Sequence, residues 1–289
     1  MTISILSLHT YPVKSCCGIT HTQVSVTPGG LAHDRQWVVA DEHGVFLSQR
    51  SQPRMALVQP ALDETALFLN APEMPTLRVS LRKGETAADA TPLSIGHSVT
   101  LGLDEGDTAA HWFSDYLGRA CRLYRVHPNA HRLVAAQDVT AWRETHPEAE
   151  GFPQEHPLGF ADAFPFNIVN QASLDDLNAR LVAAGHPPAG LLRFRPNIVI
   201  QGLQPYEEDE LCSLHVGDLT FAAVSRATRC TMINVDPATG ESGVEPLATL
   251  SAYRCFEERV LFGLNAVVAG VSRGTVLSVG DRVLPVHEA

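Results

Sequence analysis

Residues 224–234 read V-S-R-A-T-R-C-T-M-I-N, and the apolar run L-T-F-A-A-V of residues 219–224 leads into them. Such a run is typical of a β-strand, so Cys230 is expected where a strand meets a loop. Arg226 and Arg229 stand just before this cysteine. Cationic neighbours favour the thiolate, which is the form that attacks an electrophile or binds a metal. The alternative is a buried structural cysteine, because free Cys is among the most buried residue types.

The remaining cysteines indicate a reducing compartment. The chain has six cysteines, and they form neither a C-x-x-C pair nor the spacing of a zinc site. Cys16 and Cys17 are adjacent, which is a poor arrangement for an ordinary disulfide. Cys121, Cys212 and Cys255 lie in or beside regular structural patterns, so we expect them to pack in the interior. These observations favour a cytoplasmic protein.

Length and composition exclude several functional classes. With 289 residues, 45% of them hydrophobic and 18% charged, the chain fits a soluble globular protein with one large domain or two ordinary ones. The net charge of -11 argues against general nucleic-acid binding, which needs a basic surface. No stretch approaches about 20 uninterrupted apolar residues, so no membrane span is expected. The first ten residues alternate like a strand and do not resemble a signal peptide.

The periodicity predicts an α+β fold in which antiparallel strands predominate. Short strand patterns and turns fill the first third of the chain, and helical spacing follows from about residue 108 to Gly118. Ser173 is expected to cap a second helix. Residues 211–224 and 276–286 each predict a hairpin around a Gly-Asp pair. We expect barrels with about three helices outside, and no nucleotide cradle, since the chain lacks G-x-G-x-x-G and P-loop motifs.

Residues 127–159 differ from the rest of the chain. They hold several His, Pro and Glu residues and little periodicity, which predicts a long loop or lid with a domain border nearby. His127 and His131 are four residues apart, but Pro128 disfavours a regular metal-binding helix there. We therefore expect these histidines to be solvated. The predicted domains are residues 1–126 and residues 127–289.

Four separate stretches carry polar and cationic residues that could converge on one site. They are Y-P-V-K-S at 11–15, H-D-R at 33–35, R-F-R-P-N at 193–197 and T-R-C at 228–230. Together they supply Lys14, Arg35, Arg195 and Arg229, with Ser15, Asn197 and Thr228 as neutral partners. Such a set suits a phosphate and a polar heterocycle, because guanidinium groups match the geometry of phosphate oxygens. The alternative is a scatter of surface cations on separate elements.

In this order the motifs Y-P-V-K-S, H-D-R-Q-W, F-R-P-N-I-V-I and R-C-T-M-I-N-V-D-P-A-T-G resemble the MOSC superfamily. More narrowly, they are similar to the mitochondrial amidoxime reducing component and its bacterial relatives. The match runs from about residue 5 to residue 286 and includes A-S-L-D-D-L-N-A-R-L and G-T-V-L-S-V-G-D. The resemblance implies a MOSC N-terminal β-rich domain, then a MOSC β-barrel with a few outer helices. It also implies a pterin-based molybdenum cofactor, molybdopterin, bound between them.

The resemblance also assigns roles to residues. It implies that Cys230 ligates molybdenum beside the pterin dithiolene, and soft thiolate ligation suits a redox metal. Lys14, Ser15 and Arg35 fall on positions that hold the cofactor phosphate. Asp162 is a candidate for orienting substrate or relaying a proton. The positions that line the pterin and the metal are Arg195, Asn197, Thr228 and Arg229. The resemblance implies pyridoxal phosphate binding only as a label of the family as a whole, without residues assigned to it.

The implied activity is a molybdenum-dependent oxidoreductase. It would reduce N-hydroxylated compounds (hydroxylamines, amidoximes and N-hydroxylated bases) to amines. Electrons would come from a separate protein that is ferredoxin-, flavodoxin- or cytochrome b5-like with its reductase, because the cysteines lack the spacing of a Cys₄ cluster. Two alternatives stay open. Cys230 could carry a persulfide for sulfur transfer, or the protein could be a non-catalytic cofactor carrier.

Three departures from the family pattern bear on specificity. The family stretch Ser-Asp-Thr-Ser-Pro-Phe reads A-D-A-F-P-F at residues 161–166, so hydroxyls that could bind the pterin are missing at Ala163 and Phe164. Many family members have a Cys-x-x-Cys motif, of which this sequence keeps only the second cysteine, Cys230. The usual Phe-Gly-Gln of the family ends in Leu264 here. Phe164 could narrow the pocket or belong to the core.

Overall fold

The computed structural model describes residues 2–82, 90–146 and 152–287. Within these residues the largest sheet has nine strands in the order β19-β14-β15-β17-β12-β13-β1-β2, with β16 beside β17. Neighbouring strands are antiparallel except β12 and β13. The strands are β1 (Ser4–Thr10), β2 (Ile19–His21), β12 (Phe166–Asn170), β13 (Ile198–Gln201), β14 (Leu211–Val216), β15 (Leu219–Arg229), β16 (Cys255–Phe256), β17 (Arg259–Ala269) and β19 (Leu284–His287).

This sheet closes on itself into a barrel. A β-bridge joins Ser4 of β1 to Arg282, which lies just before β19 at the other end of the strand order. The amide of Ile5 also donates a hydrogen bond of 2.9 Å to the carbonyl of Asp281. The opening strand of the chain is therefore part of the same barrel as strands from its second half.

A smaller sheet covers the barrel and completes its core. It consists of β18 (Val276–Ser278), β3 (Gln23–Thr27) and β4 (Gly30–Leu31). Val24, Val26 and Leu277 of this sheet are buried in one apolar cluster with Phe166 and Phe221 of the barrel. The rings of Phe166 and Phe221 meet edge to face, with their centroids 5.1 Å apart. The alternation of buried and exposed residues in β3 matches a strand with one buried face.

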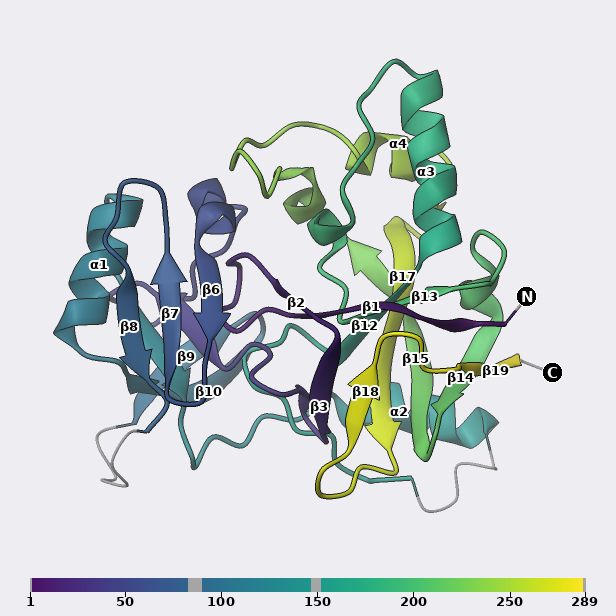
Figure 1. Ribbon diagram of the computed structural model, residues 1–289, viewed down its shortest axis with the longest axis horizontal. Coiled ribbons are helices and arrows are strands. Elements are labelled where there is room, and N and C mark those ends of the chain that lie inside the picture. Colours follow the sequence, from purple (N-terminus) through teal and green to yellow (C-terminus); the bar gives the residue numbers. More distant parts are fainter. Residues whose placement is uncertain (1, 83–89, 147–151, 288–289) are drawn as a thin grey trace.

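A second lobe lies beside the barrel (Figure 1). Its antiparallel sheet has the order β5 (Trp37–Ala40), β11 (Arg122–Val126), β10 (Ser98–Asp104) and β9 (Thr91–Ile95). A meander of β6 (Gln59–Leu62), β7 (Ala66–Asn70) and β8 (Leu77–Ser80) lies with it, as does α1 (Asp107–Leu117). Ala109, Trp112, Phe113 and Tyr116 of α1 are buried at helical spacing, and Gly118 ends the helix in the left-handed conformation with φ 65°. The first predicted helix is thus confirmed.

Three helices accompany the barrel in the part of the chain that the structure describes. α3 (Gln171–Ala183) and α4 (Leu247–Ser251) lie beside each other at one end, and α2 (Ala136–Thr145) lies towards the other (Figure 1). Short 3₁₀ turns are η1 (Pro53–Leu57), η3 (Leu191–Phe194), η4 (Glu207–Glu210) and η5 (Thr231–Asn234). The α+β class with predominantly antiparallel strands is confirmed. Among the described residues, no helix is both long and apolar enough to cross a bilayer.

Helix α2 corrects the prediction that residues 127–159 are one long loop. Val139 and Trp142 form its buried side, and the indole of Trp142 donates a hydrogen bond of 3.0 Å to the carbonyl of Cys212 on β14. Two buried positions make too narrow a stripe to show as periodicity, so tertiary contacts decide this helix. His127 is also buried rather than solvated, and its Nδ1 accepts the amide proton of Asn129 at 3.0 Å.

Two further local predictions were wrong. The cap of α3 is Asn170, whose Oδ1 accepts the amide of Ala172 at 3.2 Å, while Ser173 lies inside the helix and donates to Glu208 at 2.7 Å. The strands near residues 276–286 do not pair as a hairpin. β18 pairs with β3 and β19 pairs with β14, because each finds an open sheet edge elsewhere in the fold.

Candidate functional site

The predicted site residues meet around two adjoining cavities. The smaller, of about 130 Å³, and the larger, of about 560 Å³, share Arg35, Asp162, Asn167, Thr228 and Arg229. Eight of the nine predicted residues line the smaller cavity, namely Lys14, Ser15, Arg35, Asp162, Arg195, Thr228, Arg229 and Cys230. The ninth, Asn197, lines the larger one and is almost fully buried. The alternative, that the predicted cations are scattered over separate surface elements, is therefore excluded.

Lys14 and Ser15 follow the end of β1. The amide of Lys14 donates to the carbonyl of Trp37 at 2.7 Å, which fixes this segment against β5. The Lys14 ammonium is buried and donates to the Phe160 carbonyl at 2.9 Å and to Asp162 Oδ1 at 2.5 Å. The Ser15 hydroxyl is also buried, yet it has no hydrogen-bond partner among the described residues. A buried polar atom without a partner is costly, so this hydroxyl is available to a ligand.

Lys14 and Asp162 form the charged pair of the site. Desolvation by the surrounding cavity acts to raise the pKa of Asp162, but the Lys14 ammonium outweighs it, with help from Arg35 and Arg195, and the pKa lies at about 2. The carboxylate itself stays largely exposed to solvent. Burial lowers the pKa of Lys14, and Asp162 opposes that shift. Each partner therefore stabilises the charged form of the other.

Arg132 holds the segment that carries Asp162, and sequence patterns gave no sign of it. Its guanidinium donates to the carbonyls of Gly159, Ala161 and Asp162, and its Nε donates to Ser98 Oγ at 2.8 Å. Three carbonyls within four residues thus converge on one buried cation. This arrangement fixes the backbone of Asp162 beside Lys14.

Arg35 and Arg195 approach the smaller cavity from opposite halves of the chain. Arg35 forms an ion pair with Asp34, and it donates to the Arg195 carbonyl at 3.3 Å. Arg195 donates to the Cys16 carbonyl at 2.7 Å. Ser15, Arg35 and Arg195 have φ values of 66°, 48° and 51°. Left-handed backbone is uncommon outside glycine, and such outliers cluster at functional sites.

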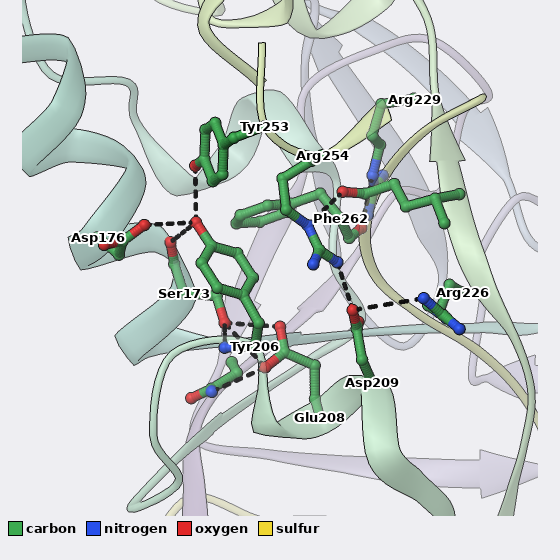
Figure 2. A network of polar contacts seen from close by, with 12 residues as sticks. Ser173, Asp176, Tyr206, Glu208, Asp209, Arg226, Arg229, Tyr253, Arg254 and Phe262 are labelled. Carbon is green, nitrogen blue, oxygen red and sulfur yellow. Dashed lines mark hydrogen bonds and ion pairs between the residues drawn. The ribbon is translucent and has the colours of Figure 1, made fainter. Parts of the chain in front are cut away.

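Arg229 lines both cavities, but its guanidinium group donates its hydrogen bonds to other groups of the protein. Its guanidinium donates to the Phe262 carbonyl at 2.7 and 2.8 Å, to the Phe194 carbonyl at 2.9 Å and to Asn167 Oδ1 at 3.1 Å. Figure 2 shows this side chain directed at Phe262. Burial lowers the pKa of Arg229 to about 10, although Cys230 acts in the opposite sense. Arg229 therefore fastens the end of β15 to β17 behind the cysteine.

Cys230 is exposed, so the alternative of a buried structural cysteine is wrong. Arg50 is the cation that meets it, with Nη1 3.5 Å from the Cys230 sulfur. Arg226, predicted as a cationic neighbour, instead lies 3.8 Å from Asp209, which also binds Arg254 (Figure 2). Irregular pairing of β15 with β17 around Arg226 accompanies this change of direction. The cation that hydrogen-bonds to the thiol thus comes from the first half of the chain.

The other cysteines differ in burial, and Cys17 is half-buried. Cys121 and Cys212 are buried, as predicted for packing residues. Cys16 is buried as well, and burial raises its pKa to about 12. Cys255 is exposed on β16, which contradicts its predicted packing role. Of the cysteines, Cys230 lines the cavity that collects the predicted cations.

The Lys14–Asp162 pair predicts an acid-sensitive contribution to stability. The folded pKa of Asp162 is about 2, against about 4 in an unfolded chain. A lowered folded pKa stabilises the protein above the unfolded value, and this stability is lost as pH falls through the folded value. The wild-type advantage over Asp162→Asn should shrink by about 1 kcal/mol between about pH 4 and about pH 2. The full shift corresponds to roughly 2.5 kcal/mol, but solvent screens this largely exposed carboxylate.

Urea unfolding at several pH values measures this effect. The matched control is Asp218→Asn, because Asp218 is exposed in the turn between β14 and β15. A wild-type advantage that stays constant across that pH range would contradict the proposed charge coupling.

Comparison with known proteins gives a consistent result. The model of the MOSC N-terminal beta barrel domain matches residues 2–120, and the model of the MOSC domain matches residues 155–284. The chain is 33% identical to human mitochondrial amidoxime-reducing component 1, covering 97% of this chain and 82% of that protein. It is 32% identical to mitochondrial amidoxime reducing component 2 of Rattus norvegicus, covering 94% and 80%.

The chain is also similar to larger proteins. It is 28% identical to the molybdenum cofactor sulfurase of Solanum lycopersicum over 97% of this chain, but it spans 35% of that relative's length. The matched domain models, together with similarity to the amidoxime reducing components over most of both chains, settle the family. The chain belongs to the MOSC family, with a MOSC N-terminal beta barrel domain followed by a MOSC domain.

Proposed function

We propose that this protein binds a pterin-based molybdenum cofactor and reduces N-hydroxylated compounds to amines. The observation that carries the proposal is one cavity that joins Lys14, Arg35 and Arg195 to the exposed thiol of Cys230. Cations and a soft sulfur ligand in one cavity suit a molecule with a phosphate at one end and a redox metal at the other. The similarity to amidoxime reducing components over most of both chains supports the same activity.

The residues present fit such a cofactor. The buried Ser15 hydroxyl has no partner, and it lines the cavity together with Lys14, Arg35 and Arg195. These groups would hold the phosphate. Thr228 and Arg229 would line the pterin and the metal, as would Asn197, and Cys230 would be the thiolate ligand. The bound cofactor would supply two-electron redox chemistry and an acceptor for the oxygen that leaves the substrate nitrogen.

The overall reaction sets what the protein must provide. A hydroxylamine takes up two electrons and two protons and yields the amine and water. We propose that a separate electron-donor protein supplies the electrons. Asp162 is a poor proton donor near neutral pH, because its pKa of about 2 keeps it ionised. We therefore assign Asp162 an orienting role. Its carboxylate, which lines both cavities, would accept a hydrogen bond from the substrate N–H or O–H group.

The direct test combines metal analysis with turnover. Protein from a cofactor-competent host should contain molybdenum and pterin and should reduce benzamidoxime with a chemical reductant. Protein from a cofactor-deficient host should do neither. Bound cofactor without turnover would favour the non-catalytic carrier, and active protein without molybdenum would reject the proposal.

Sulfur transfer is the second candidate function. It is favoured by the exposure of Cys230 and by Arg50, which lies 3.5 Å from its sulfur and would stabilise a persulfide anion. Similarity to molybdenum cofactor sulfurases points the same way, although the chain covers about a third of their length. Mass spectrometry after incubation with a cysteine desulfurase and cysteine separates the two. A sulfur atom added at Cys230 and passed to an acceptor would favour the transferase.

Phe164 is expected to set substrate size. It lines the larger cavity and also packs against the apolar cluster that includes Trp142 and Val267. In Phe164→Ser the ratio of turnover on bulky to small N-hydroxylated substrates should rise about ten-fold, because pocket contacts discriminate by that order. Phe164→Leu, which keeps an apolar contact, should give a smaller change. Equal changes in rate across the whole substrate series would instead assign Phe164 to the core.

A further inference from the structure

Tyr11 contacts two of the arginines that line the smaller cavity, Arg35 and Arg195, which come from opposite halves of the chain. Its ring centroid lies 4.4 Å from Cζ of Arg35 and 4.2 Å from Cζ of Arg195. The two guanidinium carbons are therefore within about 9 Å of each other. Both arginines line the smaller cavity. One buried aromatic ring thus supports two like charges at the same place.

The charges around this ring do not cancel. Arg35 is paired with Asp34, but Arg195 forms no ion pair with a carboxylate within the described part of the chain. Two nearby guanidinium groups repel each other, and the face of a neutral aromatic ring attracts both. Burial raises the pKa of Tyr11 well above its usual value, so the phenol stays neutral. The ring can therefore hold the pair without adding a charge.

The Tyr11 ring is itself held tightly. The amide of Tyr11 donates to Asp34 Oδ1 at 2.7 Å, and its carbonyl accepts the amide of Arg35 at 2.9 Å. Gly18 lies against the ring edge, since a Cβ there would come within 2.6 Å of Tyr11 Cε1. The phenol oxygen is buried without a partner among the described residues. The contacts that matter are thus those of the ring and the backbone.

We propose that Tyr11 is a positioning residue that holds Arg35 and Arg195 together as one binding pair for a phosphate dianion. The identity of that dianion rests on the proposed function, in which it is the terminal phosphate of the cofactor. The ring offsets the repulsion between the guanidinium groups before the ligand arrives. Lys14 and the unpartnered hydroxyl of Ser15 line the same cavity and complete the set of donors.

The test uses cofactor-free protein and inorganic phosphate. Phosphate affinity is measured by calorimetry, with chloride at equal ionic strength as the control. Tyr11→Phe keeps the ring and should bind phosphate within about two-fold of wild type. Tyr11→Leu removes the aromatic face and should weaken binding about ten-fold. A folded Tyr11→Leu protein with wild-type affinity would overturn the proposal. So would an equal loss in Tyr11→Phe, because the hydroxyl would then be the acting group.

A second experiment, in the Arg195→Gln background, tests whether Tyr11 acts by positioning Arg195 or only by packing. With Arg195→Gln there is no second cation to hold, so adding Tyr11→Leu should weaken phosphate binding by less than about two-fold. Equal losses from Tyr11→Leu in both backgrounds would mean that the ring acts independently of Arg195, against the proposal. If Tyr11→Leu does not fold, phosphate binding is measured on the Gly18→Ala variant instead. It presses on the ring edge and should weaken phosphate binding, and unchanged affinity would overturn the proposal.

Two results separate failure of the role proposed for Tyr11 from failure of the proposed function. Wild-type protein that binds phosphate in the expected pattern but reduces no N-hydroxylated substrate would reject the reductase and leave the role of Tyr11 standing. An active reductase in which Tyr11→Leu keeps wild-type phosphate affinity would reject the role of Tyr11 alone.

Discussion

The substitution Cys230→Ser should lower reductase turnover by at least about a hundred-fold while the protein remains folded. Loss of a partner that merely orients a metal ligand costs about 10- to 100-fold, so loss of the ligand itself should cost more. A serine hydroxyl is hard and mostly protonated, which makes it a poor match for a site that uses a soft thiolate. The fold should survive, because Cys230 is exposed at the start of η5 and the change is nearly isosteric.

Turnover with a chemical reductant, molybdenum content and circular dichroism measure this outcome together. The matched control is Cys255→Ser, because Cys255 is also exposed and lies on β16 beside β17. It should keep full activity. Wild-type turnover in Cys230→Ser would reject the assignment. Loss of metal in Cys16→Ser or Cys17→Ser, with retention in Cys230→Ser, would move the ligand to the first half of the chain.

The convergence of the site could be predicted because its motifs stand at strand ends. Lys14 follows the end of β1, Asn197 precedes β13 and Cys230 follows β15. β1 and β13 are neighbours in the barrel sheet that also contains β15. A motif at the end of each strand can therefore reach the same cavity, and the order of the motifs indicated which family geometry to expect.

The contacts that sequence reasoning missed are those without a local signal. Arg50 and Cys230 are 180 residues apart, and no periodicity links them. Arg226 is near Cys230 in the sequence, yet irregular strand pairing and the carboxylate of Asp209 carry it elsewhere. Arg132 acts by binding backbone carbonyls, which have no residue signature at all. Such partners are decided by tertiary packing, which the order of residues does not reveal.

Tertiary contacts also distinguish Arg193 from Arg195, which are two residues apart in the sequence. Arg193 and Arg195 both line the smaller cavity. Arg193 is bound to Asp236 at 2.7 Å and to the Asn234 carbonyl at 3.1 Å, so its charge is already balanced. Arg195 rests on Tyr11 and the Cys16 carbonyl, without a carboxylate partner in the described chain. We therefore expect the first to stabilise the protein and the second to bind an anion.

Matched substitutions should show opposite effects at these two positions. Arg195→Gln should lose at least ten-fold in cofactor retention, because a charge-assisted hydrogen bond to phosphate contributes about 1.5–3 kcal/mol. Its melting temperature without cofactor should fall less than that of Arg193→Gln, because it loses the hydrogen bond to the Cys16 carbonyl but no ion pair. Arg193→Gln should keep its molybdenum but lose about 1 kcal/mol of unfolding free energy, the usual contribution of a partly exposed ion pair. Metal analysis and urea unfolding of both variants provide the comparison. If Arg193→Gln loses the cofactor while Arg195→Gln keeps it, the phosphate site has been placed on the wrong arginine.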